Sequence, residues 1–202
     1  MSDITSNYRS EVTDQRWLEP WVPKILALCQ GGPILELGSG FGTDARYLCA
    51  QGLSVISLDV STAAFGEQGV HLSQRIPIQA DLAAGLPFRD GSLPFVLASL
   101  CLHYFSWATT VAACQEIRRV LCPHGLLLAR LNSTKDVNYG AGSGEQLGRN
   151  YYQVGPQCKR FFDEADVRRL FQDWRVEHLE EKTIDRYDKP KVVWALSAHP
   201  PS

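Results

Sequence analysis

Short apolar runs alternate with amphipathic stretches along most of this 202-residue chain, and that alternation constrains the fold more than any other feature. The runs with the length and composition of strands are residues 34–37, 54–59, 77–80, 95–100, 126–131, 176–182 and 192–197. Helical patterns lie at residues 43–50, 108–121 and 163–171, with a turn or helix at 62–71. Such alternation is typical of a parallel sheet wound with helices. The sequence therefore predicts an α/β fold, in which a hairpin with the loop DRYDKP joins the last two strands.

The length and charge limit the classes of protein that this chain can represent. A chain of 202 residues has the usual size of one domain, so we expect residues 1–202 to form a single unit with a mobile polar arm at 1–16. The net charge of -2 provides no positive field for nucleic acid. No apolar run approaches the roughly 20 residues of a membrane span, and the polar start does not resemble a signal peptide. We therefore expect a cytoplasmic protein without a nucleic-acid or membrane partner.

The six cysteines contain no C-x-x-C pair and lie mostly inside apolar segments. Small reduced cysteines in a core explain this pattern better than disulfides or a zinc site do. We expect no metal. The cysteines are Cys29, Cys49, Cys101, Cys114, Cys122 and Cys158.

The stretch ILELGSGFGTDARYL joins a strand to a helix through three glycines. Backbone N–H groups at such a junction can face a nucleoside or dinucleotide, and glycine lets the ligand come close. The glycines are Gly38, Gly40 and Gly42, so the spacing is G-x-G-x-G, whereas dinucleotide-binding oxidoreductases have G-x-G-x-x-G. Glu36 precedes them, and a carboxylate there favours a cationic ligand over a pyrophosphate. A tight turn without any ligand remains the alternative.

This junction resembles motif I of the class I S-adenosylmethionine (SAM)-dependent methyltransferases, in which E/D-x-G-x-G-x-G follows the first strand. Asp59 ends the second strand SVISLDVS, 23 residues after Glu36, and matches the second marker of the family. IQADLAAGLPFRDGSLPFVLASLCLHYF and EIRRVLCPHGLLLARLN resemble its later strands, so the resemblance covers about residues 34–198. It implies a Rossmann-like, seven-stranded, mostly parallel sheet with an antiparallel last strand and helices on both faces. SAM would be the cofactor and S-adenosylhomocysteine the product.

The resemblance also implies which residues would bind SAM. Asp59 suits the two ribose hydroxyls because one carboxylate can accept both hydrogen bonds, although it could instead cap a turn. Asp81 would accept from the adenine amino group and the Leu82 backbone would meet the ring, although an aspartate here is also common in turns. The expected cofactor residues are Glu36, Gly38, Ser39, Gly40, Gly42, Asp59, Val60, Asp81, Leu82 and Ser99.

Residues 132–155 hold five glycines and show neither helical nor strand periodicity. A loop of this length is usually functional or disordered, so we expect residues 132–160 to form a substrate loop or lid, with a solvated loop as the alternative. His103 is a candidate general base, although a histidine between aromatic residues is more often structural. The expected substrate residues are His103, Tyr104, Asn132, Tyr139, Tyr151, Tyr152 and Arg160.

The leading hypothesis is an enzyme that transfers a methyl group from SAM to an O, N or S atom of a small molecule. Its order of elements looks most like small single-domain branches such as the tellurite-resistance-type enzymes. A SAM-binding protein that regulates or does not methylate is the first alternative, and an NAD(P)-binding oxidoreductase is the second. The sequence names neither the acceptor nor the oligomeric state.

Overall fold

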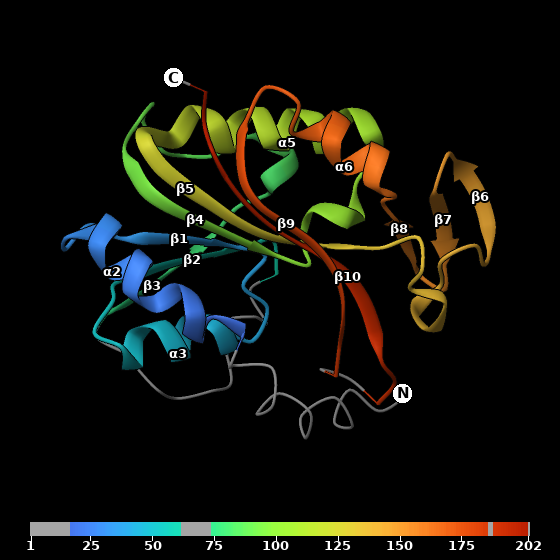
Figure 1. Cartoon of the computed structure of the whole chain (residues 1–202), viewed down its shortest axis with the longest axis horizontal. Coiled ribbons are helices and arrows are strands. Elements are labelled where there is room, and N and C mark those ends of the chain that lie inside the picture. The colour runs from blue at the N-terminus through green and yellow to red at the C-terminus, as the bar shows by residue number, and fades with distance from the viewer. Residues whose placement is uncertain (1–16, 62–73, 186–187, 202) are drawn as a thin grey trace.

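The computed structural model describes residues 17–61, 74–185 and 188–201. Its main feature is a seven-stranded sheet with the order β3-β2-β1-β4-β5-β10-β9 (Figure 1). Strands β1 to β5 pair in parallel, and β10 runs antiparallel to both β5 and β9. This confirms the expected α/β architecture with an antiparallel last strand. The strands are β1 (Ile34–Leu37), β2 (Val55–Asp59), β3 (Arg75–Gln79), β4 (Leu93–Ser99), β5 (Leu121–Asn132), β9 (Arg175–Ile184) and β10 (Lys191–His199).

Helices cover both faces of this sheet (Figure 1). Because successive side chains of a strand point to opposite faces, neighbouring residues of one strand enter different apolar layers. Ile34 packs in the layer with α2 (Val22–Cys29) and α3 (Thr43–Ala50). Leu35 packs in the layer with α5 (Trp107–Val120) and α6 (Glu164–Leu170). Both layers hold the parallel strands rigidly, so the side chains at their carboxyl ends have fixed positions.

β5 begins earlier than the sequence suggests. The apolar run predicts a strand at residues 126–131, but β5 already starts at Leu121. From the Leu93–Leu121 pair to the Phe95–Leu126 pair, β4 advances two residues while β5 advances five. The extra residues of β5 form a bulge, in which proline and glycine are tolerated because ladder hydrogen bonds are interrupted.

We expected residues 132–160 to form an irregular loop, and this prediction of their structure was wrong. A small antiparallel sheet stands there, formed by β6 (Glu145–Gly148), β7 (Tyr151–Val154) and β8 (Gln157–Arg160) (Figure 1). Its strands are only four residues long and every residue of β6 is exposed, so they leave no apolar alternation to detect. Glycine turns at positive φ, such as Gly155 between β7 and β8, reverse the chain.

Four short 3₁₀ turns complete the described structure: η3 (Glu19–Trp21), η4 (Leu82–Ala84), η5 (Leu102–Tyr104) and η6 (Val137–Tyr139). The expected arm at 1–16 and the turn or helix at 62–71 lie outside the described residues. Among the described helices, none is long and apolar enough to cross a membrane.

Candidate functional site

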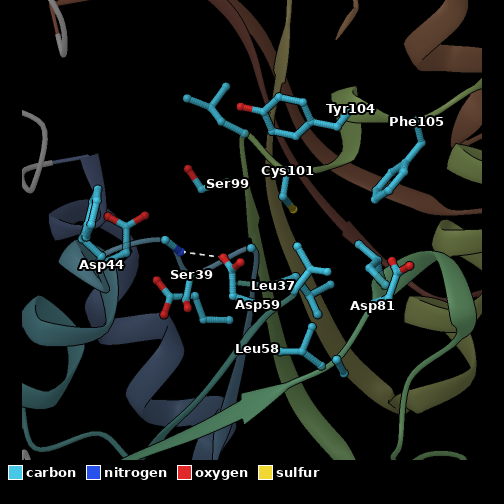
Figure 2. A pocket seen from close by; sticks show the side chains of 18 of the residues that line it. Leu37, Ser39, Asp44, Leu58, Asp59, Asp81, Ser99, Cys101, Tyr104 and Phe105 are labelled. Carbon is cyan, nitrogen blue, oxygen red and sulfur yellow. Dashed lines mark hydrogen bonds between the residues drawn. The ribbon is translucent and has the colours of Figure 1, made fainter. Parts of the chain in front are cut away.

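A cavity of about 570 Å³ opens at the carboxyl ends of β1, β2 and β4. Figure 2 shows that its lining comes from these strand ends and from the segment that carries Cys101, Tyr104 and Phe105. All of the expected cofactor residues except Gly42 line it. Open α/β sheets bind ligands at this edge, so the cavity is the candidate site.

The glycines of the first junction have distinct roles. Gly38, Gly40 and Gly42 have φ values of 62°, 49° and 72°, a region that favours glycine. A Cβ at Gly38 would lie 2.4 Å from the Cβ of Cys101, whereas a Cβ at Gly40 would meet no atom within 4 Å. Gly42 precedes α3 as its N-cap, and a Cβ there would lie 2.5 Å from the Arg75 guanidinium. Gly40 is therefore open to a ligand, while Gly38 allows close packing on Cys101 and Gly42 faces the Arg75 guanidinium.

Asp59 ends β2 and fixes the glycine loop from below. Its Oδ2 accepts a hydrogen bond from the Gly40 backbone N–H at 2.9 Å, drawn in Figure 2, and its Oδ1 accepts from the Ser61 N–H at 2.9 Å. Asp59 therefore does cap a turn, which the sequence analysis gave as the alternative to binding a ligand. Each carboxylate oxygen can accept a further bond, so Asp59 can hold the loop and still bind a hydroxyl pair in the cavity.

Glu36 is buried, with 4% of its surface exposed. Burial and, next, the nearby Asp44 carboxylate together raise its pKa to about 8, against opposing contributions from the Ser57 hydrogen bond and the Arg75 charge. The Ser57 hydroxyl donates to Glu36 Oε2 at 2.8 Å and itself accepts from Arg75 Nε at 2.9 Å. Glu36 is therefore largely protonated near neutral pH unless a cation in the cavity lowers its pKa, which revises the fixed negative charge that the sequence suggested.

Asp81 follows β3 and caps η4, since its Oδ1 accepts from the Ala83 N–H at 2.8 Å. Leu82 is buried beside it, and Val60, which follows β2, is 65% exposed. All three line the cavity, together with Ser99 at the end of β4. Asp81 is thus a turn residue, as the alternative from the sequence held. It also lines the cavity, so its contact with a ligand stays a prediction.

Arg130, Trp17 and Asp44 link the two sides of the cavity wall through contacts with one another and with Ser99. The sequence analysis did not select these three as site residues. Arg130 is fully buried and donates to the Ser99 hydroxyl from Nε at 2.9 Å and from Nη2 at 2.7 Å. Its guanidinium lies 3.9 Å from the ring centroid of Trp17, whose Nε1 donates to Asp44 Oδ1 at 3.1 Å. The available signal was the single arginine inside the apolar run LLLARL. Because Ser99 accepts two hydrogen bonds, its own O–H is left to donate elsewhere.

Of the expected substrate residues, Tyr104 alone lines this cavity. His103 is buried directly behind it, with ring centroids 4.2 Å apart, and burial lowers the pKa of His103 well below its ordinary value. Tyr139 donates its hydroxyl to the Lys189 carbonyl at 2.9 Å. Asn132 is fully buried at the end of β5. The cavity instead receives Phe105 and Gln157, which the sequence analysis did not select.

The remaining expected substrate residues belong to the small sheet. Arg160 is buried and donates to the carbonyls of Phe105 at 3.3 Å and Arg149 at 3.1 Å, with its guanidinium 4.8 Å from the Tyr151 ring. Tyr152 packs near Phe161, with ring centroids 6.2 Å apart. Arg160 and its neighbours thus attach the small sheet to the segment after β4. Within the described residues, no cluster of histidine, cysteine or acidic side chains could hold a metal, and all six cysteines are free thiols.

Comparison with known proteins agrees with this geometry. Residues 35–129 match the family described as "Methyltransferase domain". An uncharacterized methyltransferase of Synechocystis sp. is 34% identical over 101 residues, which are 50% of this chain and 47% of that protein. A demethylmenaquinone methyltransferase of Beutenbergia cavernae is 33% identical over 132 residues, 65% of this chain and 53% of that protein. The chain spans about half the length of the curated relatives it matches.

Solved structures share the fold at low sequence identity. A SAM-dependent methyltransferase from Methanosarcina mazei has a TM-score of 0.74 and 17% identity, covering 89% of this chain and 97% of that one. A Burkholderia thailandensis 1,6-didemethyltoxoflavin-N1-methyltransferase, solved with 1,6-didemethyltoxoflavin and S-adenosylhomocysteine, has a TM-score of 0.70 and 16% identity over 95% and 81%. The [4+2]-cyclase SpnF has a TM-score of 0.65 and 15% identity over 91% and 81%.

These matches show that residues 35–129 resemble a methyltransferase domain and that the chain has the fold shared by solved SAM-dependent methyltransferases.

Proposed function

We propose that this protein transfers a methyl group from SAM to an O, N or S atom of a small-molecule acceptor and releases S-adenosylhomocysteine. The observation that carries the proposal is the Asp59–Gly40 contact at the mouth of a cavity of about 570 Å³, since it holds Gly40, whose Cβ position is open, against the space that a nucleoside would fill. The demethylmenaquinone and didemethyltoxoflavin methyltransferases support a small organic acceptor. We further propose that, within these enzymes, the protein belongs to the small single-domain, tellurite-resistance-type branch.

The cavity wall fits the parts of SAM in turn. Asp59 would receive the ribose hydroxyls, and Asp81 and Leu82 would border the adenine. The Gly38 to Gly40 backbone would lie along the amino-acid tail, with the buried Glu36 below a positively charged group. Bound SAM supplies a methyl group on a cationic sulfur that an acceptor atom can displace in line. Gly42 would act indirectly, by starting α3 against Arg75.

The residues of this chain would mainly align the acceptor and exclude water. Tyr104 and Phe105 provide aromatic walls beside the cavity, and Gln157 connects it to the small sheet. His103 is a weaker candidate base than the sequence suggests, because its lowered pKa reduces its affinity for a proton and Tyr104 rather than His103 lines the cavity. An acceptor that ionises easily would need no base from the protein.

We further propose that residues 1–202 act as one methyltransferase domain in the cytoplasm, with no nucleic-acid or membrane partner. Residues 132–160 would shape the acceptor side, which is supported by Gln157 of β8 in the cavity wall.

A thermal denaturation series with SAM, S-adenosylhomocysteine and NAD tests the proposal. We expect the first two ligands to raise the melting temperature and NAD to leave it unchanged, because the glycine spacing differs from that of dinucleotide sites. A rise with NAD alone would reject the methyltransferase function in favour of an oxidoreductase. S-adenosylhomocysteine production across a metabolite panel then tests transfer itself.

A SAM-binding protein that does not methylate is the second candidate. The structural similarity to the [4+2]-cyclase SpnF favours keeping it, because that protein shares the fold and is named for a different reaction. Binding of SAM without S-adenosylhomocysteine production on any acceptor in the panel would support this candidate.

A further inference from the structure

The cavity has a part with acidic side chains and a part without charged ones. Its four acids lie on β1, at the start of α3, and at or just after the ends of β2 and β3, where the cofactor is proposed to bind. Figure 2 shows Cys101, Tyr104 and Phe105 on the side of the cavity away from Leu58. We call this second part the aromatic end. It is lined by Ser99, Leu100, Cys101, Tyr104 and Phe105, at and after the end of β4, and by Gln157 of β8.

The aromatic end offers no charged partner to a ligand. Among the described residues that line the cavity there is no lysine, arginine or histidine. Arg130 stands behind Ser99, and its Nε and Nη2 donate to that hydroxyl at 2.9 and 2.7 Å. A charged group in the aromatic end would lose its water without gaining a partner of opposite charge there, which costs free energy. The lining therefore favours an uncharged acceptor.

The two aromatic rings of this end are supported from outside the cavity. Tyr104 has 42% of its surface exposed, and the buried His103 ring lies behind it with ring centroids 4.2 Å and planes 42° apart. The Phe105 carbonyl accepts from Arg160 Nε at 3.3 Å, which attaches the Phe105 backbone to β8. An exposed ring with a supported back can take a further ring, because offset and tilted aromatic pairs are favourable.

Leu100 has a backbone conformation that a leucine disfavours. Its φ is 57°, in the left-handed region, and its N–H donates to the Arg130 carbonyl at 2.9 Å, which holds it there. Strain of this kind persists only where the surrounding structure fixes it, and it is common at ligand sites. Leu100 lines the cavity beside Ser99 and Cys101, so the strain keeps an apolar residue in the cavity wall.

We propose that the methyl acceptor is an uncharged aromatic molecule whose ring lies against Leu100, Tyr104 and Phe105. The Ser99 hydroxyl and the Gln157 amide border the same space, and each can hydrogen-bond a hydroxyl or a ring nitrogen of the acceptor. This inference rests on the proposed methyl transfer and adds the class of acceptor to it.

The transfer balances without another reactant. A lone pair on the hydroxyl oxygen or ring nitrogen of the acceptor forms the bond to the methyl carbon. The carbon–sulfur bond breaks, and its electron pair stays on the sulfur, which becomes neutral. The proton of the acceptor passes to water at the open side of the cavity, beside the exposed Tyr104. No side chain of the aromatic end has to gain or lose a proton.

Ligands that differ only in charge or aromaticity test the acceptor class. One set is methyl 4-hydroxybenzoate, 4-hydroxybenzoate and methyl 4-hydroxycyclohexanecarboxylate, and a second set has the corresponding hydroxynaphthoate compounds. We would measure thermal shifts of the full chain loaded with S-adenosylhomocysteine. In at least one set the aromatic ester should raise the melting temperature more than its carboxylate and its saturated analogue do. The proposal is rejected if neither ester does so, including the case in which neither ester binds.

Substitutions of Tyr104 and Leu100 test the contacts with the ring. In Tyr104→Ala the dissociation constant of the better ester should rise about tenfold because a ring contact is lost, whereas Tyr104→Phe should keep the affinity. Leu100→Asn should also raise the dissociation constant about tenfold. Its melting temperature should stay close to that of the wild type, because asparagine adopts the left-handed conformation more readily than leucine does. Leu26→Asn is the matched control, since it changes an exposed leucine of α2 outside the cavity lining.

Binding of S-adenosylhomocysteine separates this proposal from the proposed function. Its affinity should stay unchanged in Tyr104→Ala, so that a weaker ester affinity reports on the acceptor. Wild-type ester affinity in both Tyr104→Ala and Leu100→Asn would overturn the aromatic end as the acceptor site, and so would equal effects of Leu100→Asn and Leu26→Asn. Failure of the wild-type chain to bind S-adenosylhomocysteine would instead overturn the methyltransferase function.

Discussion

Asp59 ends β2 and Glu36 lies one residue before the end of the neighbouring β1, yet the structure gives their carboxyl groups different tasks. Asp59 keeps the Gly40 N–H in place at the cavity mouth, whereas Glu36 is buried below the loop with Ser57 as its hydrogen-bond donor. The first can act on a ligand directly. The protonation of Glu36 instead depends on the charge of the group that occupies the cavity.

Replacing Asp59 with alanine should weaken binding of S-adenosylhomocysteine by about 1–3 kcal/mol, because a charge-assisted bond and the support of Gly40 are both lost. Isothermal titration calorimetry measures the change. Asp173→Ala is a suitable control because Asp173 is an exposed acid outside the cavity. An unchanged affinity in Asp59→Ala would remove this residue from the site.

The raised pKa of Glu36 predicts a pH-dependent stability in the free protein. The folded carboxyl has a pKa of about 8 and its ordinary value is 4.5, so the folded state binds more protons than the unfolded state between these values. Its contribution to stability is complete below pH 4.5 and is lost as pH rises toward 8. Melting temperatures from pH 5 to 8 should therefore fall less steeply in Glu36→Gln than in the wild type. Parallel curves for the two proteins would show that Glu36 is not protonated in the folded state.

At the scale of elements, the glycine junction combines two functions in one short loop. Gly38 lets the loop pass close to Cys101 of the segment after β4, and Gly40 leaves the cavity side open. Substitutions at the two positions should therefore fail for different reasons, although both have positive φ.

Gly40→Arg should abolish binding of S-adenosylhomocysteine while the protein still folds, because its side chain enters open space and only the backbone conformation costs about 1–2 kcal/mol. Gly38→Ala should lower the melting temperature more than Gly40→Ala does, because its Cβ would overlap the Cys101 side chain. Circular dichroism and calorimetry separate loss of folding from loss of binding. Full ligand affinity in Gly40→Arg would place the cofactor elsewhere.

For the whole molecule, the large sheet and the small sheet differ in how they are held. β1 and β4 are buried almost throughout between two helical layers, while β6 is entirely exposed. The small sheet is attached to the rest by the hydrogen bond from Arg160 to the Phe105 carbonyl, by Arg149 and Asn150 bonding to Asp163 and Asp166, and by backbone hydrogen bonds. Local opening is easiest where few buried apolar contacts oppose it.

Hydrogen exchange should therefore separate the two sheets. Amides of β6 and β7 should exchange well before those of β1, β4 and β5, whose protection should approach the global free energy of unfolding. Mass spectrometry of peptides from 145–154 and 93–99 makes this comparison. Equal protection of both peptides would mean that the small sheet opens only when the whole protein unfolds.

Much of this architecture could be predicted because buried parallel strands and their helices leave a strong pattern. The strand 34–37 and the helix 43–50 have the expected bounds, and the glycine spacing with Asp59 located the cavity. The small sheet could not be predicted because exposed four-residue strands need no apolar periodicity. The roles of Arg130 and Gln157 depend on contacts between distant segments, which residue patterns do not record.

The two ends of the small sheet are joined where they leave the main fold. Phe162 N–H donates to the Asn132 carbonyl at 2.8 Å, and Thr134 N–H donates to the Phe162 carbonyl at 3.0 Å. The intervening segment thus begins and ends at one point, and its length can change without moving β5 or α6. Residues 135–161 are therefore an insertion between two joined points of the main fold, and a segment exchanged for it would have to keep the Asp136–Lys191 ion pair and the hydrogen bond from Arg160 to the Phe105 carbonyl.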